Sequence, residues 1–162
     1  MKKHKIDVRS TLPFIGKLLD IGLLRRCIRT ALDAEGVDMP CEISVLITND
    51  EGIRVINRDF REKDVPTDVL SFPMQVLSPG KFNPDLSEIN RDTGCQPLGD
   101  IVLSYDRIAE QAEQYDQDIN REMAYLAIHS VLHLLGYDHL DEAEEKRAMR
   151  AREEAILKGL HL

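Results

Sequence analysis

The spacing of apolar side chains changes along the chain between a period of two and a period near four. Residues 4–9 and 41–48 alternate polar and apolar positions, and the second segment is rich in β-branched residues, so both are predicted to be strands. Residues 12–35 between them repeat apolar side chains at helical spacing and predict a helix, with an irregular start because of Gly16 and Gly22.

The middle of the chain predicts one more helix and two more strands. Residues 51–60 follow two polar residues that can cap a helix, and residues 67–72 and 98–104 have the composition of strands. Residues 78–97 hold three prolines and two glycines with few apolar side chains, which predicts a long surface loop. Such a loop either covers a cleft or is a harmless insertion, and the pattern leaves both open.

Three helices are predicted at the C-terminal end, at about 105–114, 119–135 and 141–157. The second leaves no wide polar face, so we expect it to be buried. The third opens with Asp141 and Glu144, spaced as in a capping box. Strands and helices do not alternate regularly. The predicted fold is therefore an α+β single domain over residues 1–162, with a mixed sheet of about four strands packed by helices.

Three of the five histidines fall within eleven positions at the end of the buried helix: His129, His133 and His139. The first two are one helical turn apart on one face, and Gly136 can end the helix so that His139 folds back towards them. Three converging imidazoles leave a fourth position for water, which is typical of a catalytic zinc site rather than a closed structural one. Nickel or copper could substitute for the zinc.

The residues that flank the histidines help to decide between a zinc site and its alternatives. A lone histidine on an apolar helix is usually a core residue with a hydrogen-bond partner, but burying two imidazoles is costly unless a shared metal serves both. The spacing also matches the metzincin proteases, except that Ser130 replaces the glutamate that serves them as general base. No residue is identified as the base. Asp138 is the nearest carboxylate in sequence, and we favour a role in orienting a ligand imidazole.

The segment from His129 to His139 resembles the signature of the YbeY family of bacterial endoribonucleases, H-G-x-L-H-L-x-G-Y-D-H, with Ser130 where that family usually has glycine. Residues 56–72 are similar to a second block of that family, which ends in P-T-D-V-L-S-F. The resemblance spans most of residues 40–140. It implies a zincin-like helix carrying the metal ligands and a single-strand-specific, metal-dependent endoribonuclease in rRNA maturation and ribosome quality control.

Arg54, Arg58 and Arg61 form a stripe along the predicted helix 51–60 and its end. On pattern alone such a stripe is best interpreted as a solvated face. The resemblance instead implies that Arg61 is a functional arginine near the metal, where it could hold a phosphate and stabilise charge in the transition state. Arg54 and Arg58 would then be further RNA contacts. Zinc held by imidazoles can lower the pKa of its bound water to about 7.

Composition narrows the choice of partners. The net charge of −8 argues against general affinity for nucleic acid, so RNA or a ribosome would need a local basic patch. Three widely spaced cysteines without a C-x-x-C motif favour reduced thiols in the cytoplasm, and the pattern predicts no signal peptide and no membrane segment. Two other classes stay open: a zincin-like metallopeptidase, and a non-enzymatic ribosome-associated factor with a structural metal.

Overall fold

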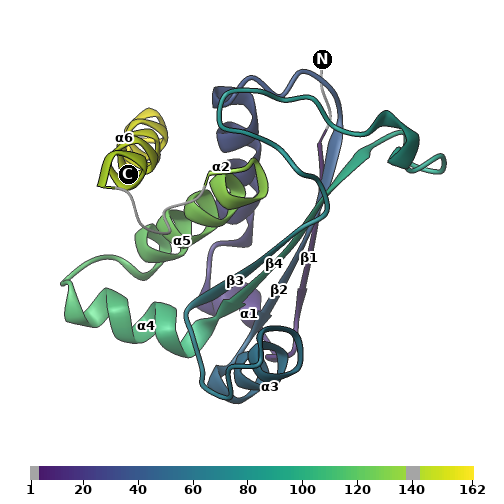
Figure 1. The fold of residues 1–162 in the computed structure, drawn as a ribbon. Helices are drawn as coiled ribbons and strands as arrows, with labels where there is room; N and C mark the ends of the chain where they lie inside the picture. Colours follow the sequence, from purple (N-terminus) through teal and green to yellow (C-terminus); the bar gives the residue numbers. More distant parts are fainter. Residues whose placement is uncertain (1–3, 138–142) are drawn as a thin grey trace.

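Figure 1 shows the computed structural model, which describes residues 4–137 and 143–162. Its four strands form one mixed sheet in the order β1-β2-β4-β3. Their bounds are Lys5–Ser10 (β1), Cys41–Thr48 (β2), Val69–Pro73 (β3) and Gln96–Ser104 (β4). The strands β1, β2 and β4 are parallel, whereas the edge strand β3 runs antiparallel to β4. The α+β prediction with a mixed sheet of four strands is confirmed.

The helices are Ile15–Leu18 (α1), Ile21–Ala34 (α2), Asp50–Arg61 (α3), Tyr105–Gln114 (α4), Ile119–Leu134 (α5) and Ala143–Gly159 (α6). A short 3₁₀ turn at Leu86–Glu88 lies in the long loop before β4. Strand and helix boundaries otherwise fall within about two residues of those predicted from the sequence. The capping box predicted at Asp141 lies outside the described residues.

The prediction of a single helix over residues 12–35 is wrong, although the irregular start expected near Gly16 and Gly22 is present. The chain breaks after Leu18, because Leu19 is extended and buried, and Asp20 starts a new helix by accepting a hydrogen bond from the Leu23 amide at 3.0 Å. Helical spacing of the apolar residues continues through the break and conceals it. The cap at Asp20 is the local feature that decides where α2 begins.

The helices cover the two faces of the sheet unequally. Helices α2 and α5 pack on one face, and α6 packs against both of them (Figure 1). Helix α3 covers only part of the opposite face, over a small apolar cluster of Ile53, Leu70 and Val102. Helix α5 lies between the sheet and α6, with most of its residues buried and none exposed, as its apolar circumference predicted. Among the described residues, no helix combines the length and apolar character that crossing a membrane requires.

Candidate functional site

The last two turns of α5 carry two histidines with their rings close together. His129 and His133 lie one turn apart, their ring centroids are 4.5 Å apart, and their Nε2 atoms are separated by 3.0 Å. Helix α5 ends after Leu134, and Gly136 then takes a positive φ of 99°. The sequence spacing thus predicted correctly that both imidazoles share one face and that Gly136 follows the end of the helix.

The other ring nitrogen of each histidine faces a hydrogen-bond acceptor. His129 Nδ1 lies 2.7 Å from Glu153 Oε2 on α6, and His133 Nδ1 lies 2.9 Å from the Tyr137 carbonyl oxygen. A carbonyl or a carboxylate accepts hydrogen bonds, so each Nδ1 carries the proton and donates. In the neutral imidazoles, each Nε2 therefore presents a lone pair to the other ring.

This arrangement fits a divalent cation. Two lone pairs 3.0 Å apart repel one another unless a cation or a proton lies between them. Two nitrogen ligands of a tetrahedral zinc ion, each about 2.0–2.1 Å from the metal, are roughly 3.3 Å apart. The observed separation is within a few tenths of an ångström of that value, and the acceptors on both Nδ1 atoms are those that a metal-binding histidine usually has.

The third predicted ligand, His139, and the predicted orienting carboxylate, Asp138, both lie outside the described residues. Within residues 4–137 and 143–162, no group of three or more His, Cys, Asp or Glu side chains is placed to hold a metal ion. The structure therefore gives the geometry of two of the three predicted ligands, His129 and His133.

Both histidines line a groove with a volume of about 770 Å³. Its walls come from the edge strand β3 with the chain that follows it, and from α5 with the turn that ends it. Arg61 at the end of α3 and Asp68 just before β3 complete the lining. The structure thus brings Arg61 to the same groove as His129 and His133, which are more than sixty residues away in sequence.

Arg61 is fixed against the free edge of the sheet. Its Nη2 donates a hydrogen bond of 2.5 Å to the Ser71 carbonyl oxygen, and its guanidinium lies 5.2 Å from the centre of the Phe72 ring. The side chain is otherwise exposed. A guanidinium carries five N–H donors in one plane, and the bond to Ser71 uses one of them. An oriented, exposed guanidinium is suited to binding a phosphate at two points.

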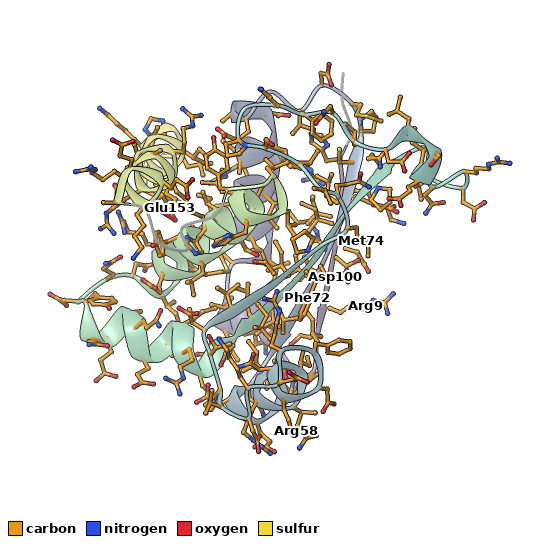
Figure 2. The ribbon with its side chains drawn as sticks, in the orientation of Figure 1. Arg9, Arg58, Phe72, Met74, Asp100 and Glu153 are labelled. Carbon is orange, nitrogen blue, oxygen red and sulfur yellow. The ribbon has the colours of Figure 1, made fainter. Side chains whose placement is uncertain are left out.

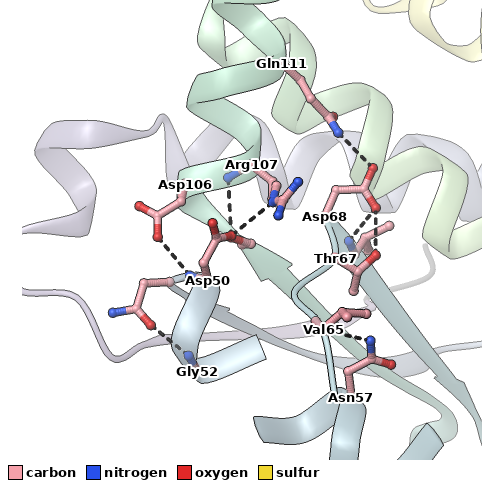
Figure 3. A network of polar contacts seen from close by, with 12 residues as sticks. Asp50, Gly52, Asn57, Val65, Thr67, Asp68, Asp106, Arg107 and Gln111 are labelled. Atoms are coloured by element: carbon pink, nitrogen blue, oxygen red, sulfur yellow. Dashed lines mark hydrogen bonds and ion pairs between the residues drawn. The ribbon is translucent and has the colours of Figure 1, made fainter. Parts of the chain in front are cut away.

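Polar contacts hold both ends of the region that positions Arg61 (Figure 3). At the start of α3, the Asp50 carboxylate accepts hydrogen bonds from Ser104 and Arg107 at 2.9 and 3.2 Å. Asn57, inside α3, donates through Nδ2 to the carbonyl oxygen of Val65 in the turn after the helix, at 2.9 Å. Asp68 then accepts a bond from Gln111 of α4 at 3.2 Å. These contacts link α3, the following turn and α4, and so set the position of Arg61 relative to β3.

The other two arginines of the predicted stripe do not line this groove. Arg54 forms ion pairs with Glu51 and Asp64, and Arg58 pairs with Asp59 at 3.0 Å. Local carboxylates thus compensate both charges, as expected for a solvated helix face. Their contribution to RNA binding stays a prediction, and these ion pairs weaken it.

Ser130, the position that differs from the family signature, is buried and turned towards the sheet. Its hydroxyl lies 2.5 Å from that of Ser71 on β3. Ser71 thus contacts Ser130 through its hydroxyl and Arg61 through its carbonyl oxygen. The hydroxyl of Ser130 connects α5 to the strand that holds Arg61.

Comparison with known proteins places these motifs in one family. The family model described as endoribonuclease YbeY matches residues 19–161, which is most of the chain. The chain belongs to the endoribonuclease YbeY family. A relative of that name from Oceanobacillus iheyensis is 45% identical over 137 residues, covering 85% of both chains. Another, from Clostridium botulinum strain Eklund 17B, is 46% identical over 145 residues, covering 86% of this chain and 87% of the relative.

A solved structure supports the fold. The solution structure of protein TM1509 from Thermotoga maritima aligns with a TM-score of 0.58 at 22% identity, covering 96% of this chain and 91% of the other. At this identity the similarity concerns the fold alone. It agrees with the α+β architecture that the sequence predicted for a YbeY family member.

The residues that accept hydrogen bonds from the Nδ1 atoms of the two histidines were not predicted from the sequence. Glu153 on α6 contacts His129, and Tyr137 contacts His133 and donates a hydrogen bond to the carboxylate of Glu35. Burial and the neighbouring Glu35 charge raise the pKa of Tyr137 to about 12, so its hydroxyl stays protonated. One signal was available in the sequence: Glu153 falls in the apolar stripe of α6, between Met149 and Ile156.

A second hollow, of about 650 Å³, lies on the opposite face of the sheet beside α3. Its polar residues include Arg9 and Asp100, and Phe72 borders it (Figure 2). Burial raises the pKa of Asp100 above its usual range. The lining of this hollow contains no histidine, whereas His129 and His133 line the groove on the other side.

Proposed function

We propose that this chain is a metal-dependent endoribonuclease that cleaves single-stranded RNA during rRNA maturation. The enzyme class follows from membership of the YbeY family. The RNA substrate and the link to the ribosome are inferred from that family, and the metal from the site itself. The three free, buried cysteines favour the cytoplasm as its location.

One observation carries the proposal: the paired imidazoles and an exposed arginine line the same groove. His129 and His133 bring two Nε2 atoms within 3.0 Å, and both Nδ1 atoms already donate to acceptors. His139 is the proposed third ligand. When bound, a divalent cation there would supply the Lewis-acid chemistry that activates water for attack on a phosphodiester. We propose zinc, for which nickel or copper could substitute.

Within this proposal Arg61 binds and orients the phosphate. Its bond to the Ser71 carbonyl oxygen holds the guanidinium at the edge of β3, so the remaining donors keep one orientation towards the groove. The chain as a whole is negatively charged, and Arg61 is the one cationic residue among those lining the described groove. RNA affinity would therefore depend on this residue more than on Arg54 or Arg58.

Peptidase chemistry is disfavoured by the position that follows His129. A zincin peptidase uses a glutamate there as general base, whereas Ser130 is buried and its hydroxyl contacts Ser71. A hydroxyl is too weak a base at neutral pH to take this role, and its contact turns it towards the strand. Cleavage of single-stranded RNA, without cleavage of an unfolded peptide, is the expected specificity.

The test is single-turnover cleavage of one labelled RNA by Arg61→Ala, with Arg58→Ala as the matched control. Both substitutions remove one exposed positive charge from α3, and only Arg61 lines the groove. We expect Arg61→Ala to retain its metal and to cleave about a hundredfold more slowly or worse, because a charge-stabilising donor is lost. Arg61→Lys should rescue poorly, because an ammonium cannot make the planar two-point contact. Arg58→Ala should lose far less activity than Arg61→Ala, because Asp59 already compensates its charge.

The metal is tested separately by elemental analysis of His133→Ala beside His161→Ala, an exposed histidine near the C-terminus. Wild type and His161→Ala should hold about one divalent ion per chain, and His133→Ala should lose it. A fully loaded His133→Ala protein would refute the proposed ligands. Wild-type cleavage by a loaded Arg61→Ala protein would remove Arg61 from the mechanism.

A further inference from the structure

Helix α6 supplies a buried carboxylate to the proposed metal site. Glu153 is 3% exposed, and the other buried residues of α6, Met149, Ile156 and Leu157, are apolar. A carboxylate in such surroundings is costly unless it is paired. Its contact at 2.7 Å is with His129 Nδ1, across the interface between α6 and α5 (Figure 2 labels Glu153 on α6). The residue is therefore placed to orient an imidazole.

The preceding residue of α6 reaches the second histidine by a different route. Arg152 donates to the Glu35 carboxylate at 2.8 Å through Nε and contacts it at 2.6 Å through Nη2. Glu35 also accepts the hydrogen bond of the Tyr137 hydroxyl, and the Tyr137 carbonyl oxygen accepts from His133 Nδ1. The side chain of Glu35 is 5% exposed, so the carboxylate that links Arg152 to Tyr137 is shielded from water.

We propose that Arg152 and Glu153 form a clamp, the α6 clamp, that holds His129 and His133 with both Nε2 atoms directed at one point. This inference rests on the proposed function, because it assumes that the two imidazoles bind a metal. Glu153 fixes the ring and the tautomer of His129, and a carboxylate on Nδ1 also makes Nε2 a stronger electron donor. Arg152 fixes the carbonyl oxygen that does the same for His133. Both act as positioning residues.

A purely structural role for Glu153 makes a different prediction. In that case His129 would only pair with Glu153 across the interface of α5 and α6, and its Nε2 would not coordinate an added ion. The clamp requires that Nε2 coordinates the ion while Nδ1 keeps the proton that faces Glu153. The two cases differ in the nitrogen chemical shifts of the imidazole, which NMR measures in the wild-type protein before and after zinc is added, without any substitution.

The decisive comparison is Glu153→Gln against Glu154→Gln. Both remove one negative charge from adjacent positions of α6, but Glu154 is exposed. The zinc dissociation constant is measured by competition with a chelator, and thermal unfolding of the metal-free proteins is recorded alongside. We expect Glu153→Gln to weaken zinc binding by about 10–100-fold, as removal of such a partner typically does. Glu154→Gln should bind zinc as wild type does. Tyr137→Phe should cause a smaller loss than Glu153→Gln, because the acceptor of His133 is a backbone carbonyl that remains.

The outcomes separate the clamp from the proposed function. If wild type binds no zinc, the proposed metal site fails and the clamp fails with it. If wild type binds zinc and a folded Glu153→Gln protein binds it equally well, the clamp is refuted while the metal site stands. Should Glu153→Gln fail to fold, NMR of the zinc-loaded wild type decides: coordination of His129 through Nε2, with the proton on Nδ1, supports the clamp, and coordination through Nδ1 or no coordination overturns it.

Discussion

The residues at and around the two histidines differ in whether the sequence alone could predict their place in the site. His129 and His133 were predicted as metal ligands because i, i+4 spacing on a buried helix, followed by a third histidine, is typical of such ligands; their role stays a prediction. Arg61 was predicted from family resemblance, and the pattern alone favoured a solvated stripe. The contact of Glu153 with His129 was not predicted, because the two residues are 24 positions apart and only the packing of α6 on α5 brings them together.

The buried carboxyl group of Glu122 on α5 should make the free energy of unfolding depend on pH. Burial raises the pKa of its carboxyl group, and the negative charge of Asp68 adds to that effect while Arg121 opposes it. The folded protein thus binds this proton more tightly than the unfolded chain. The stability from this group is present below the unfolded pKa of about 4.3 and is lost as pH rises through the raised folded pKa.

Glu122→Gln should therefore increase the free energy of unfolding at pH 7, and the gain should shrink as pH falls towards 4. Urea unfolding at several pH values measures it, and Glu113→Gln, an exposed residue of α4, is the control. A pH-independent effect of Glu122→Gln would show that the carboxyl group is not perturbed by burial.

At the scale of whole elements, strands and amphipathic helices were predictable because each has one dominant period. The strand β2 and helix α4 have the predicted bounds, since alternation or helical spacing stops at both ends of each. The break between α1 and α2 was not predicted, because helical spacing continues through it and the extended conformation of Leu19 is a tertiary choice that buries its side chain. The position of the loop before β4 relative to the groove was likewise not predictable, because contacts between residues distant in sequence determine it.

The turn that ends α5 is the element most sensitive to a small change. Gly136 has a φ of 99°, and a Cβ atom there would lie 2.1 Å from the Leu77 carbonyl oxygen. The turn and the segment after β3 thus approach each other at a point where only glycine fits. Both segments line the groove that holds the histidines.

Gly136→Ala should lower the free energy of unfolding by about 1–3 kcal/mol and weaken metal binding, because the turn must move away from Leu77. Gly159→Ala, in α6, is the control, since a Cβ atom there meets no other atom within 4 Å. Its free energy of unfolding should be unchanged or slightly higher. Equal effects of the two substitutions in chemical denaturation would contradict the close approach seen at Gly136.

At the scale of the molecule, the sheet divides two surfaces with different chemistry. The face packed by α2 and α5 contains the main core and ends at the groove with the two histidines, while the other face is covered only in part by α3 (Figure 1). The chain as a whole carries a net charge of −8. RNA binding should therefore depend on Arg61, the one cationic residue lining the described groove, and a single phosphate contact should make it only weakly dependent on salt.

The reactivity of the three cysteines measures how readily the core and the long loop open. Cys27 and Cys41 are fully buried, and burial raises their pKa to about 11 and about 12, so the reactive thiolate is rare in the folded protein. Cys95 is 5% exposed and directly precedes β4, at the end of the long loop. Alkylation of the first two requires opening of the core, whereas movement of the loop is enough for Cys95.

We therefore expect all three thiols to react in the unfolded, unreduced protein, and only Cys95 to react at an appreciable rate in the native one. Mass spectrometry after pulses of iodoacetamide at increasing urea concentration measures each site. The rates for Cys27 and Cys41 should rise together with global unfolding, and that for Cys95 should depend less on urea. A thiol that stays unreactive after unfolding would indicate a disulfide and contradict the reduced state. Labelling of Cys27 as fast as that of Cys95 in native buffer would contradict the buried interface between α2 and the sheet.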